Sequence, residues 1–562
     1  MYKKEKLCYH KSHGCLFGSP VLIFSHSATA LLLQIMNRLT QKSIHSGFTF
    51  VIKQPLILTA LLLGASVCHA QAPEEETVVV IEAGEAEECS LPADSAERPL
   101  YRWMVEGNAA TSSRHTPFWL MNNRMGLSSL EKNNGYMRAG FFREMQHDRR
   151  FSWGFGADIA VPYNYTSRFV IQQLYGEIRY RSLELTIGSK ERYIGVVNEE
   201  LGSGDMTFSQ NARPVPQVFL SMPKYEWVPW TKQMLAVKGF FSMGMLSDWR
   251  WQRDHVGPDG NWAEHVLYHT KGLFLRWGNR EKLPLMLEGG FEMGTLFGGK
   301  AHRGDEVINM PTDLKNIIKA MLGMSGGDSG DPSQAGEISN CYGDHVGEWS
   351  LAATWAPKET DWSVRAYYQH FFEDHSQLFF DYAWKDMLLG VEFTLPKNRF
   401  VDQFVYEYLN TKDQSGSVYW DHTPDLPEQV SGADNYYNHY IYNGWQHWGM
   451  GLGNPLLISP IYNSDGSIGF RHNRVKGHHF GVSGSPTDEL HYRILMSMTR
   501  SWGTYATPLP NVERNFNAMV EMTYSPRRLA GWDFRLGLGA DGGKMLGKTL
   551  GAMLTIRKTG WL

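Results

Sequence analysis

Apolar and polar residues alternate one by one in many short stretches of this chain. In the clearest of them, residues 532–540, aromatic and aliphatic residues take every second position and Asp, Arg or Gly takes the positions between. A period of two residues is the spacing of a β-strand whose two faces meet different surroundings. The pattern recurs at residues 183–187, 362–369, 516–523 and 550–556.

The charged residues in these stretches indicate which kind of sheet they form. A soluble sandwich also alternates, but here Arg365, Glu521 and Arg535 stand at mid-strand opposite an unbroken apolar face. Outer-membrane barrels turn apolar residues toward lipid and polar residues toward the lumen. The pattern therefore predicts an all-β fold, a transmembrane antiparallel β-barrel in the outer membrane of a Gram-negative bacterium.

Counting such stretches predicts about 18 strands. The expected strands are residues 101–109, 136–145, 151–161, 169–180, 182–190, 216–222, 234–247, 266–277, 284–297, 345–355, 362–371, 386–395, 401–410, 469–483, 489–499, 512–524, 532–540 and 549–557. Short and long connections alternate between them, as expected for periplasmic turns and external loops. The strand at 216–222 has the weakest pattern and is assigned partly because the alternation of loops requires it.

A barrel of this size encloses a lumen wide enough for water unless something fills it. Three long segments are candidates for a plug: residues 191–215, 298–344 and 411–468, of which the last two are the longest. Helical spacing from Val307 to Leu322 predicts a short amphipathic helix in the second, with Pro311 near its start. Mid-strand charges are expected to form ion pairs in the lumen: Glu177, Arg179, Arg365, Glu407, Glu521 and Arg535.

Composition supports the membrane barrel. Aromatic residues make up 13% of the chain, and the mean hydropathy is −0.36. No stretch of 18 or more apolar residues occurs after residue 70, which argues against a bundle of membrane-spanning helices.

The N-terminal segment predicts export. An apolar run at residues 55–67 follows basic residues and precedes Cys68-His69-Ala70, so we expect a signal peptide cleaved after Ala70. The part upstream of Met36 resembles an over-called start, which makes residues 1–70 a start segment plus signal peptide. Residues 71–100 are an acidic periplasmic lead-in, and residues 101–562 are the barrel.

Charge and cysteine usage limit the partners. Residues 1–70 hold seven Lys or Arg and one acid, so their removal changes the net charge from −4 to about −10. A nucleic acid is an unsuitable partner for such a chain. Cys89 and Cys341 would be the remaining cysteines, and whether they pair is left open.

Two aromatic clusters in the expected external loops are candidate carbohydrate-binding sites. Aromatic faces suit pyranose rings, and nearby planar polar groups suit hydroxyls. The candidate residues are Trp249, Trp251 and Trp262 in one loop and Tyr436, Tyr437, Trp445 and Trp448 in another. The alternative is that these aromatics form the interfacial girdle of the barrel or the core of the loops.

Signals for other chemistry are weak. The histidines lack metal-ligand spacing, the acids Asp328, Asp331 and Glu337 do not form a calcium loop, and we expect no metal, cofactor or catalytic residue. His491 beside Ser497 or Ser501 is the candidate pair for a hydrolase.

Several loop motifs, taken in order, resemble those of a known family. They are Thr116–Gly126 (TPFWLMNNRMG), Leu174–Glu177, Leu185–Lys190, Gly202–Gly204, Ser209–Pro216, Asp434–His439, Gly444–Trp445 and Gly453–Leu456. This order is similar to that of the Wzi capsule-assembly family in its Bacteroides-type form, and the resemblance covers most of residues 101–562.

The resemblance implies a function. Members of the family are eighteen-stranded outer-membrane barrels, closed to transport, that act as lectins for exported capsular polysaccharide. Two features depart from the family pattern: residues 71–100 are too short and acidic for an N-terminal helical plug, and the chain ends in Trp561-Leu562 rather than in Phe.

Three functions follow as hypotheses. The favoured one is a monomeric barrel, surrounded by outer-membrane lipid, that binds and anchors or organises capsular or other surface polysaccharide without covalent chemistry. The alternatives are a general or substrate-specific porin and an outer-membrane lipid or glycan hydrolase.

Overall fold

The computed structural model describes residues 99–258, 260–324, 342–373, 385–396, 398–414 and 434–562. The expected signal peptide, nearly all of the acidic lead-in, both cysteines and the acids at 328–337 lie outside these residues.

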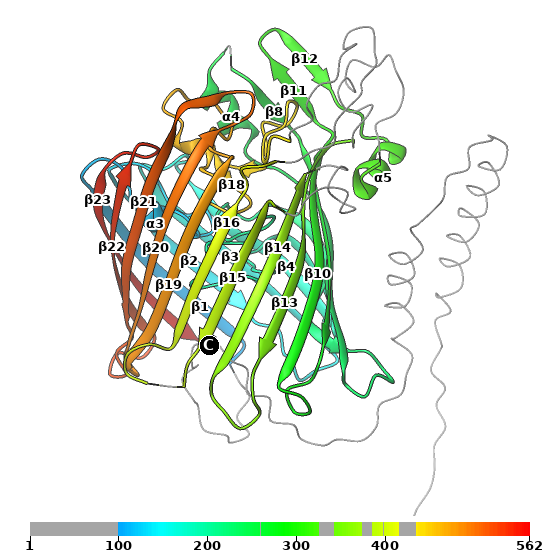
Figure 1. The fold of residues 1–562 in the computed structure, drawn as a ribbon, viewed down its shortest axis with the longest axis vertical. Coiled ribbons are helices and arrows are strands. Elements are labelled where there is room, and N and C mark those ends of the chain that lie inside the picture. Colours follow the sequence, from blue (N-terminus) through cyan, green and yellow to red (C-terminus); the bar gives the residue numbers. More distant parts are fainter. Residues whose placement is uncertain (1–98, 259, 325–341, 374–384, 397, 415–433) are drawn as a thin grey trace, which may run out of the picture. The chain divides into compact units, whose positions relative to one another are not determined.

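Eighteen antiparallel strands form one sheet that closes on itself (Figure 1). Each strand pairs with its neighbour in the chain order, and β1 pairs with β23 to complete the barrel. The strands are β1 (Tyr101–Ser112), β2 (Asn133–Arg143), β3 (Phe151–Tyr163), β4 (Val170–Tyr180), β5 (Leu183–Ser189), β6 (Gln217–Trp227), β7 (Leu235–Met245), β9 (Leu267–Trp277), β10 (Leu285–Phe297), β13 (Asp344–Trp355), β14 (Ser363–Glu373), β15 (Met387–Thr394), β16 (Gln403–Asn410), β19 (Val475–Thr487), β20 (Leu490–Gly503), β21 (Pro508–Tyr524), β22 (Trp532–Gly543) and β23 (Thr549–Trp561).

All eighteen predicted strands are confirmed, with changes at their ends. The weakly patterned strand is real and longer than expected: β6 runs through Pro223 to Trp227, with a register shift between Met222 and Glu226. A shift of this kind accommodates a proline that cannot donate to the ladder. In contrast, β19 begins at Val475 rather than at residue 469, because the residues before it belong to the external loop.

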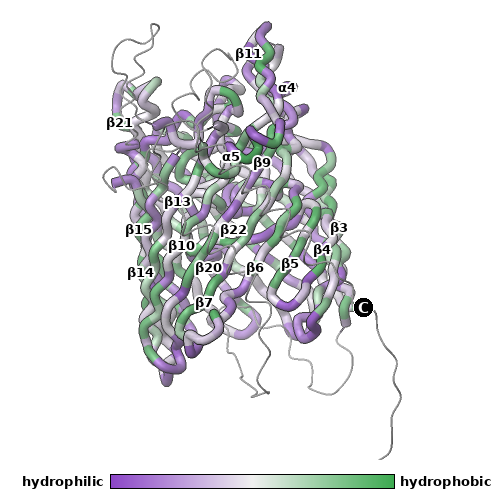
Figure 2. The backbone as a smooth tube through the Cα atoms, turned by 90° about the vertical axis from the view of Figure 1, so that its right-hand side faces the viewer, coloured by the Kyte–Doolittle hydropathy of each residue, from purple (hydrophilic) through white to green (hydrophobic). Residues whose placement is uncertain are grey.

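The alternating apolar and polar residues of each strand lie on opposite faces of the barrel wall, with apolar residues outside and polar residues in the lumen. On β22, Leu536 and Leu538 are 45% and 53% exposed on the outer face. Charged residues such as Glu106, Asp158 and Glu521 are buried in the lumen. Figure 2 shows hydrophobic and hydrophilic segments alternating along the strands. This is the reverse of a soluble protein and suits a wall that faces lipid.

The two ends of the barrel differ. Short turns join the strands at the end where the chain terminates, and the long loops gather at the other end (Figure 1). Two small sheets lie among these external loops. One consists of β8 (Trp262–Glu264), β11 (Lys300–Arg303) and β12 (Glu306–Asn309), and the other of β17 (Gln446–His447) and β18 (Met450–Gly451).

The helices in the described residues are short: α3 (Phe118–Met121), α4 (Trp249–Val256), α5 (Leu314–Leu322) and the 3₁₀ helix η3 (Pro460–Tyr462). None of them is long and apolar enough to cross a bilayer.

The helix predicted from Val307 onward is partly wrong. Residues 306–309 form β12, and α5 begins only after Asp313, whose side chain caps the backbone N–H of Lys315. Pro311 accounts for the difference, because the residue before a proline avoids the helical region. The helix rests on the external ends of the strands, where its Ala320 carbonyl lies 2.8 Å from Nε2 of His345.

Loops that enter the lumen fill the barrel. Residues 190–216, here called the inward loop, leave β5 and reach strands on the far side of the ring. The backbone N–H of Ser203 donates to Glu407 on β16 at 2.8 Å, and Arg365 on β14 donates to the Val196 carbonyl at 2.5 Å. A Cβ added to Gly481 of β19 would lie 2.4 Å from the Leu201 carbonyl oxygen, so the wall needs glycine there.

Two other loop segments share this role. The indole of Trp119 in α3 donates to Ser497 on β20 at 3.2 Å, and the N–H of Phe118 donates to Asp541 on β22 at 2.9 Å. Residues 434–474 contribute a buried core above the inward loop. The expectation that loops 191–215 and 411–468 plug the lumen is met by their described parts. In the third candidate segment, residues 298–344, the helix α5 lies at the external ends of the strands instead. The segment around α3 is an addition that sequence reasoning missed.

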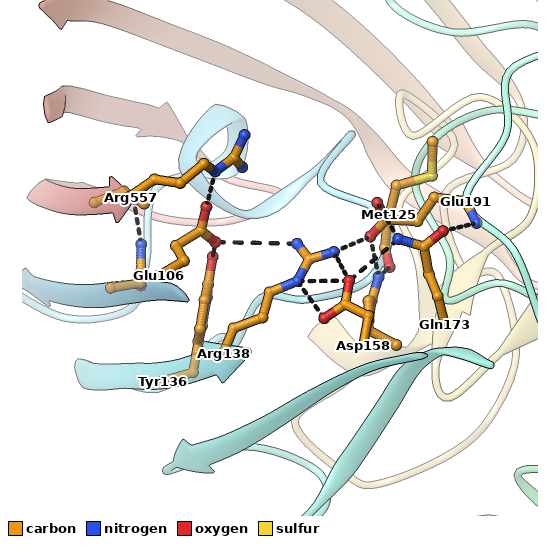
Figure 3. Close-up of polar contacts among 11 residues, drawn as sticks. Glu106, Met125, Tyr136, Arg138, Asp158, Gln173, Glu191 and Arg557 are labelled. Carbon is orange, nitrogen blue, oxygen red and sulfur yellow. Dashed lines mark hydrogen bonds and ion pairs between the residues drawn. The ribbon is translucent and has the colours of Figure 1, made fainter. Parts of the chain in front are cut away.

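Polar side chains bind the plug to the wall (Figure 3). Arg138 on β2 donates to Asp158 on β3 at 2.9 Å and to Glu191 of the inward loop at 3.0 Å. Nearby, Arg557 and Tyr136 both donate to Glu106, each at 2.6 Å. Each of these four charged residues, Arg138, Asp158, Glu106 and Arg557, therefore has partners that offset its lost hydration.

The predicted ion-pair network is present for most of its members. The Glu521 carboxylate forms ion pairs with the guanidinium groups of Arg124 at 2.6 Å and Arg493 at 2.9 Å. The guanidinium group of Arg535 lies 3.9 Å from the same carboxylate. Arg365 pairs with Glu288 at 3.3 Å.

Glu177 pairs with Lys190 at 2.6 Å, and Arg179 lies 3.9 Å from Glu184. Glu407 is the exception. It accepts hydrogen bonds from Ser203 N–H and from the Tyr367 hydroxyl instead of pairing with a base.

Asp386, just before β15, joins two external segments. Its carboxylate accepts hydrogen bonds from the Tyr436 hydroxyl at 2.9 Å and from the N–H of Asp413 at 3.0 Å. Burial raises the pKa of Asp386 to about 6, although these hydrogen bonds oppose the rise.

We predict that Glu521→Gln destabilises the barrel by about 3–5 kcal/mol, because it leaves buried guanidinium groups without a counter-charge. The midpoint of denaturant unfolding, followed by the heat-modifiable gel shift, measures the loss. The control is Glu513→Gln, nearer the external end of the same strand, which should change stability by less than about 0.5 kcal/mol. Equal midpoints for all three proteins would show that the ion cluster adds nothing.

A second prediction concerns pH. Since the folded-state pKa of Asp386 lies above its ordinary value of 3.8, its stabilising contribution is complete below about pH 4 and is lost as the pH rises through about 6. This loss amounts to roughly 3 kcal/mol. Asp386→Asn stays neutral, so its stability relative to wild type should increase between pH 4 and pH 7. A difference that is constant over this range would contradict the prediction.

Candidate functional site

The helix α4 organises the aromatic residues at the external end. Its N-cap residue Asp248 is buried and accepts hydrogen bonds from Gln252 at 3.1 Å and from the N–H of Trp448 at 2.9 Å. Gln252 in turn accepts from the N–H of Ala263 at 3.2 Å. These contacts fix α4 between β8 and the loop at residues 434–474.

The first aromatic cluster lies between α4, β8 and β11. Trp262 stacks on His302, with ring centroids 3.8 Å apart and planes only 1° from parallel. The two residues are cross-strand partners in the small sheet. Trp249 lies beside Trp262 at 6.5 Å, and Arg250 lies over the Trp249 ring at 4.9 Å.

This cluster opens on a cavity of about 440 Å³. Its walls are formed by Trp262 and His302, by the neighbouring pair Arg253–Asp254, and by Gly257, Pro258 and Gly304. Arg253 and Asp254 are 2.9 Å apart and largely exposed, so their polar groups remain available at the rim. An aromatic platform with a guanidinium and a carboxylate beside it can hold the apolar face and the hydroxyls of a sugar ring.

A second aromatic pair lies on the other side of α4. Trp251 is 6.3 Å from Trp448 and stacks on His255 at 4.8 Å. Arg213 of the inward loop lies over the Trp448 ring at 4.6 Å. Burial lowers the pKa of His255, which favours the neutral imidazole in this stack. The pair therefore connects α4 to the plug.

The remaining candidates are buried. Tyr436, Tyr437 and Trp445 have no exposed surface. The Trp445 indole donates to the Thr207 carbonyl at 2.8 Å, and the Tyr437 hydroxyl donates to the Met206 carbonyl. In this structure these three side chains hold the loops to each other and present no face to a ligand outside.

The structure thus brings together Trp249 with Trp262 and Trp251 with Trp448, and it separates both pairs from the buried three. His302 is the residue that sequence reasoning missed. It lies forty positions after Trp262, in a four-residue strand without a pattern of its own, so nothing in the sequence indicates the pairing.

The candidate hydrolase pair, His491 with Ser497 or Ser501, does not form. Ser497 lies 2.8 Å from His479, and Ser501 lies 3.0 Å from His472. His491 instead contacts Glu200 at 2.6 Å and Ser485 at 3.2 Å. This Ser–His–Glu order has the connectivity of a hydrolytic triad. Ser485, however, lies near the end of β19, where the pairing with β20 shifts register between Gly484 and Thr487, and not on the strand-to-helix turn that exposes a nucleophile.

A solved structure shares the architecture of this chain. Wzi of Escherichia coli, described as an outer membrane protein involved in group 1 capsule assembly and a carbohydrate-binding β-barrel, has 12% sequence identity and a TM-score of 0.51. The match covers 82% of this chain and 85% of that protein. OpdQ of Pseudomonas aeruginosa has 9% identity and a TM-score of 0.43, over 83% of this chain and all of the other. No curated protein sequence gives a significant match.

The sequence itself matches a family model. The model of the capsule assembly protein Wzi aligns with residues 109–456, which is more than half of the chain and includes the inward loop, α4 and the small external sheet. The chain therefore belongs to the Wzi capsule assembly protein family.

Proposed function

We propose that this outer-membrane barrel binds exported capsular or other surface polysaccharide at its external end and anchors or organises it there, without covalent chemistry. The observation that carries the proposal is the open aromatic cavity of Trp262 and His302 on a member of a capsule-assembly family. The related E. coli Wzi is itself described as carbohydrate binding, which supports the same activity here.

The chemistry of the cavity supports a saccharide ligand. Trp262 supplies a flat apolar surface, and Arg253 and Asp254 supply a fork of donors and a pair of acceptors at its rim. Arg253 also suits a sugar carboxylate or phosphate, which guanidinium binds in a bidentate manner. Trp249 extends the aromatic surface beyond the cavity, so a chain longer than one sugar would find a second contact.

The plugged lumen supports binding at the surface over transport. Contacts from the inward loop to β14 and β16 cross the barrel, and the segment around α3 reaches β20 and β22. A porin requires an open aqueous path. We propose a monomer in outer-membrane lipid, since the exposed apolar side chains surround the wall and suit lipid as a neighbour.

We predict that Trp262→Ala weakens binding of the surface polysaccharide from the source strain about tenfold, which corresponds to about 1.4 kcal/mol. Biolayer interferometry with the refolded barrel and immobilised polysaccharide measures the change. The matched control is Trp502→Ala at the external end of β20, away from the cavity walls, and it should bind like wild type.

The possible outcomes are distinct. Undiminished binding by Trp262→Ala would move the site to another part of the external surface, for example to Trp251 and Trp448. No saturable binding by the wild-type barrel would contradict the proposed function. Shortening of the polysaccharide by wild type but not by Ser485→Ala would contradict the absence of covalent chemistry.

A further inference from the structure

Three buried carboxylates meet in the lumen. Asp205 belongs to the inward loop, whereas Glu292 on β10 and Glu348 on β13 are direct cross-strand partners. All three residues are 0% exposed. One carboxylate oxygen from each residue lies within 4.8 Å of those from the other two. Like charges placed directly opposite each other are destabilising in a sheet, so this convergence is relieved either by protonation or by a bound cation.

Two of the three carboxylates are held by hydrogen bonds. Asp205 accepts from the Tyr193 hydroxyl at 2.6 Å and from the N–H of Val196 at 3.0 Å. Glu348 accepts from the N–H of Thr207 at 3.1 Å and from the Ser350 hydroxyl at 3.0 Å. The side-chain amide of Gln369 donates to both carboxylates. These donors orient two acidic groups toward the same point.

Glu292 differs from its neighbours. Both of its carboxylate oxygens are buried, and neither has a hydrogen-bond partner. Across the described residues, no Lys, Arg or His nitrogen forms an ion pair with any of the three acids. Lumenal Lys238 interacts electrostatically with Glu292 and Asp205 from beyond ion-pair distance, and its ammonium group donates to the Ile194 carbonyl at 3.1 Å. A buried carboxylate without a partner costs several kcal/mol, and Glu292 is aimed directly at two others.

A cation accounts for this arrangement. Calcium binds carboxylate oxygens at 2.3–2.6 Å, so two oxygens on opposite sides of one ion are about 4.6–5.2 Å apart and those on adjacent sides are closer. The spacing of the three acids falls within that range. The donors are all oxygen, which selects a hard cation and disfavours zinc. We propose that Asp205, Glu292 and Glu348 bind a divalent cation, Ca²⁺ in preference to Mg²⁺, which ties the inward loop to the barrel wall.

The site lies where the plug meets the external loops. The residues that follow Asp205 are Met206 and Thr207, whose carbonyls accept hydrogen bonds from Tyr437 and Trp445. A cation that holds Asp205 therefore also fixes the base of the loop at residues 434–474. Its loss should loosen both the plug and the buried aromatic residues above it.

The test counts ions on the refolded barrel. Protein refolded in detergent from denatured chains carries no lipopolysaccharide, so bound divalent cations come from the protein. After treatment with EDTA and dialysis against Ca²⁺, mass spectrometry of the metal content should give one Ca²⁺ per chain. Removal of Ca²⁺ should lower the unfolding midpoint. Parallel titration with Mg²⁺ alone is expected to show weaker binding.

Glu292→Gln is the decisive variant because it is nearly isosteric and removes one ligand charge. It should weaken Ca²⁺ binding about a hundredfold, and its unfolding midpoint should no longer respond to EDTA. The matched control is Glu407→Gln, a lumenal carboxyl that also contacts the inward loop but has its own hydrogen bonds. The control should keep one Ca²⁺ per chain.

A wild-type barrel that binds neither Ca²⁺ nor Mg²⁺ at millimolar concentration would overturn the proposal, whatever the variants do. So would a Glu292→Gln barrel with the same ion content and affinity as wild type. If Glu292→Gln does not fold, sensitised Tb³⁺ luminescence provides a second measurement, since Tyr193 contacts Asp205 directly. Absence of Tb³⁺ emission that Ca²⁺ can suppress would contradict the site. Ion counting requires no polysaccharide, so its failure is distinguishable from failure of the proposed function.

Discussion

Closure of the sheet is the constraint on which the rest of this structure depends. Inside a bilayer every backbone N–H and C=O must be satisfied without water, and pairing β1 with β23 leaves no open edge. Once eighteen strands close, the lumen is too wide for wall side chains to fill. Loops of the same chain fill the lumen, and their backbone N–H and C=O groups also need hydrogen-bond partners. The lumenal charges and amides supply them.

The polar residues of the lumen are placed where they can pair with these inward loops. Arg138 joins the wall to Glu191 of the inward loop, and Glu407 accepts from the backbone of Ser203. Such contacts are strong in a desolvated lumen, and an unmatched group there is costly. These contacts hold the plug in one defined position, as in a folded core. The plug therefore provides a rigid base for α4 and the small external sheet. Sugar binding at the surface benefits from a platform that does not move.

The strands were predictable because lipid on one side and a polar lumen on the other impose a period of two on each strand. Even β6, with Pro223 inside it, was found from the alternation of loops. The loops were less predictable, because their residues are chosen by contacts far away in sequence. Tyr437 and Trp445 look like surface platforms in the sequence, but they are buried and donate hydrogen bonds to the Met206 and Thr207 carbonyls. His302 and the three acids at 205, 292 and 348 have no local pattern, since only the closed barrel brings them together.

The central claim is that the lumen is filled by loops held to the wall, so that the barrel acts at its surface rather than as a channel. Conductance of the purified, refolded barrel in planar bilayers tests this claim most directly, with a general porin as the positive control. The account predicts no steady current through the wild-type protein across a range of applied voltages. A stable open-channel conductance of porin size would contradict it and would support the porin alternative.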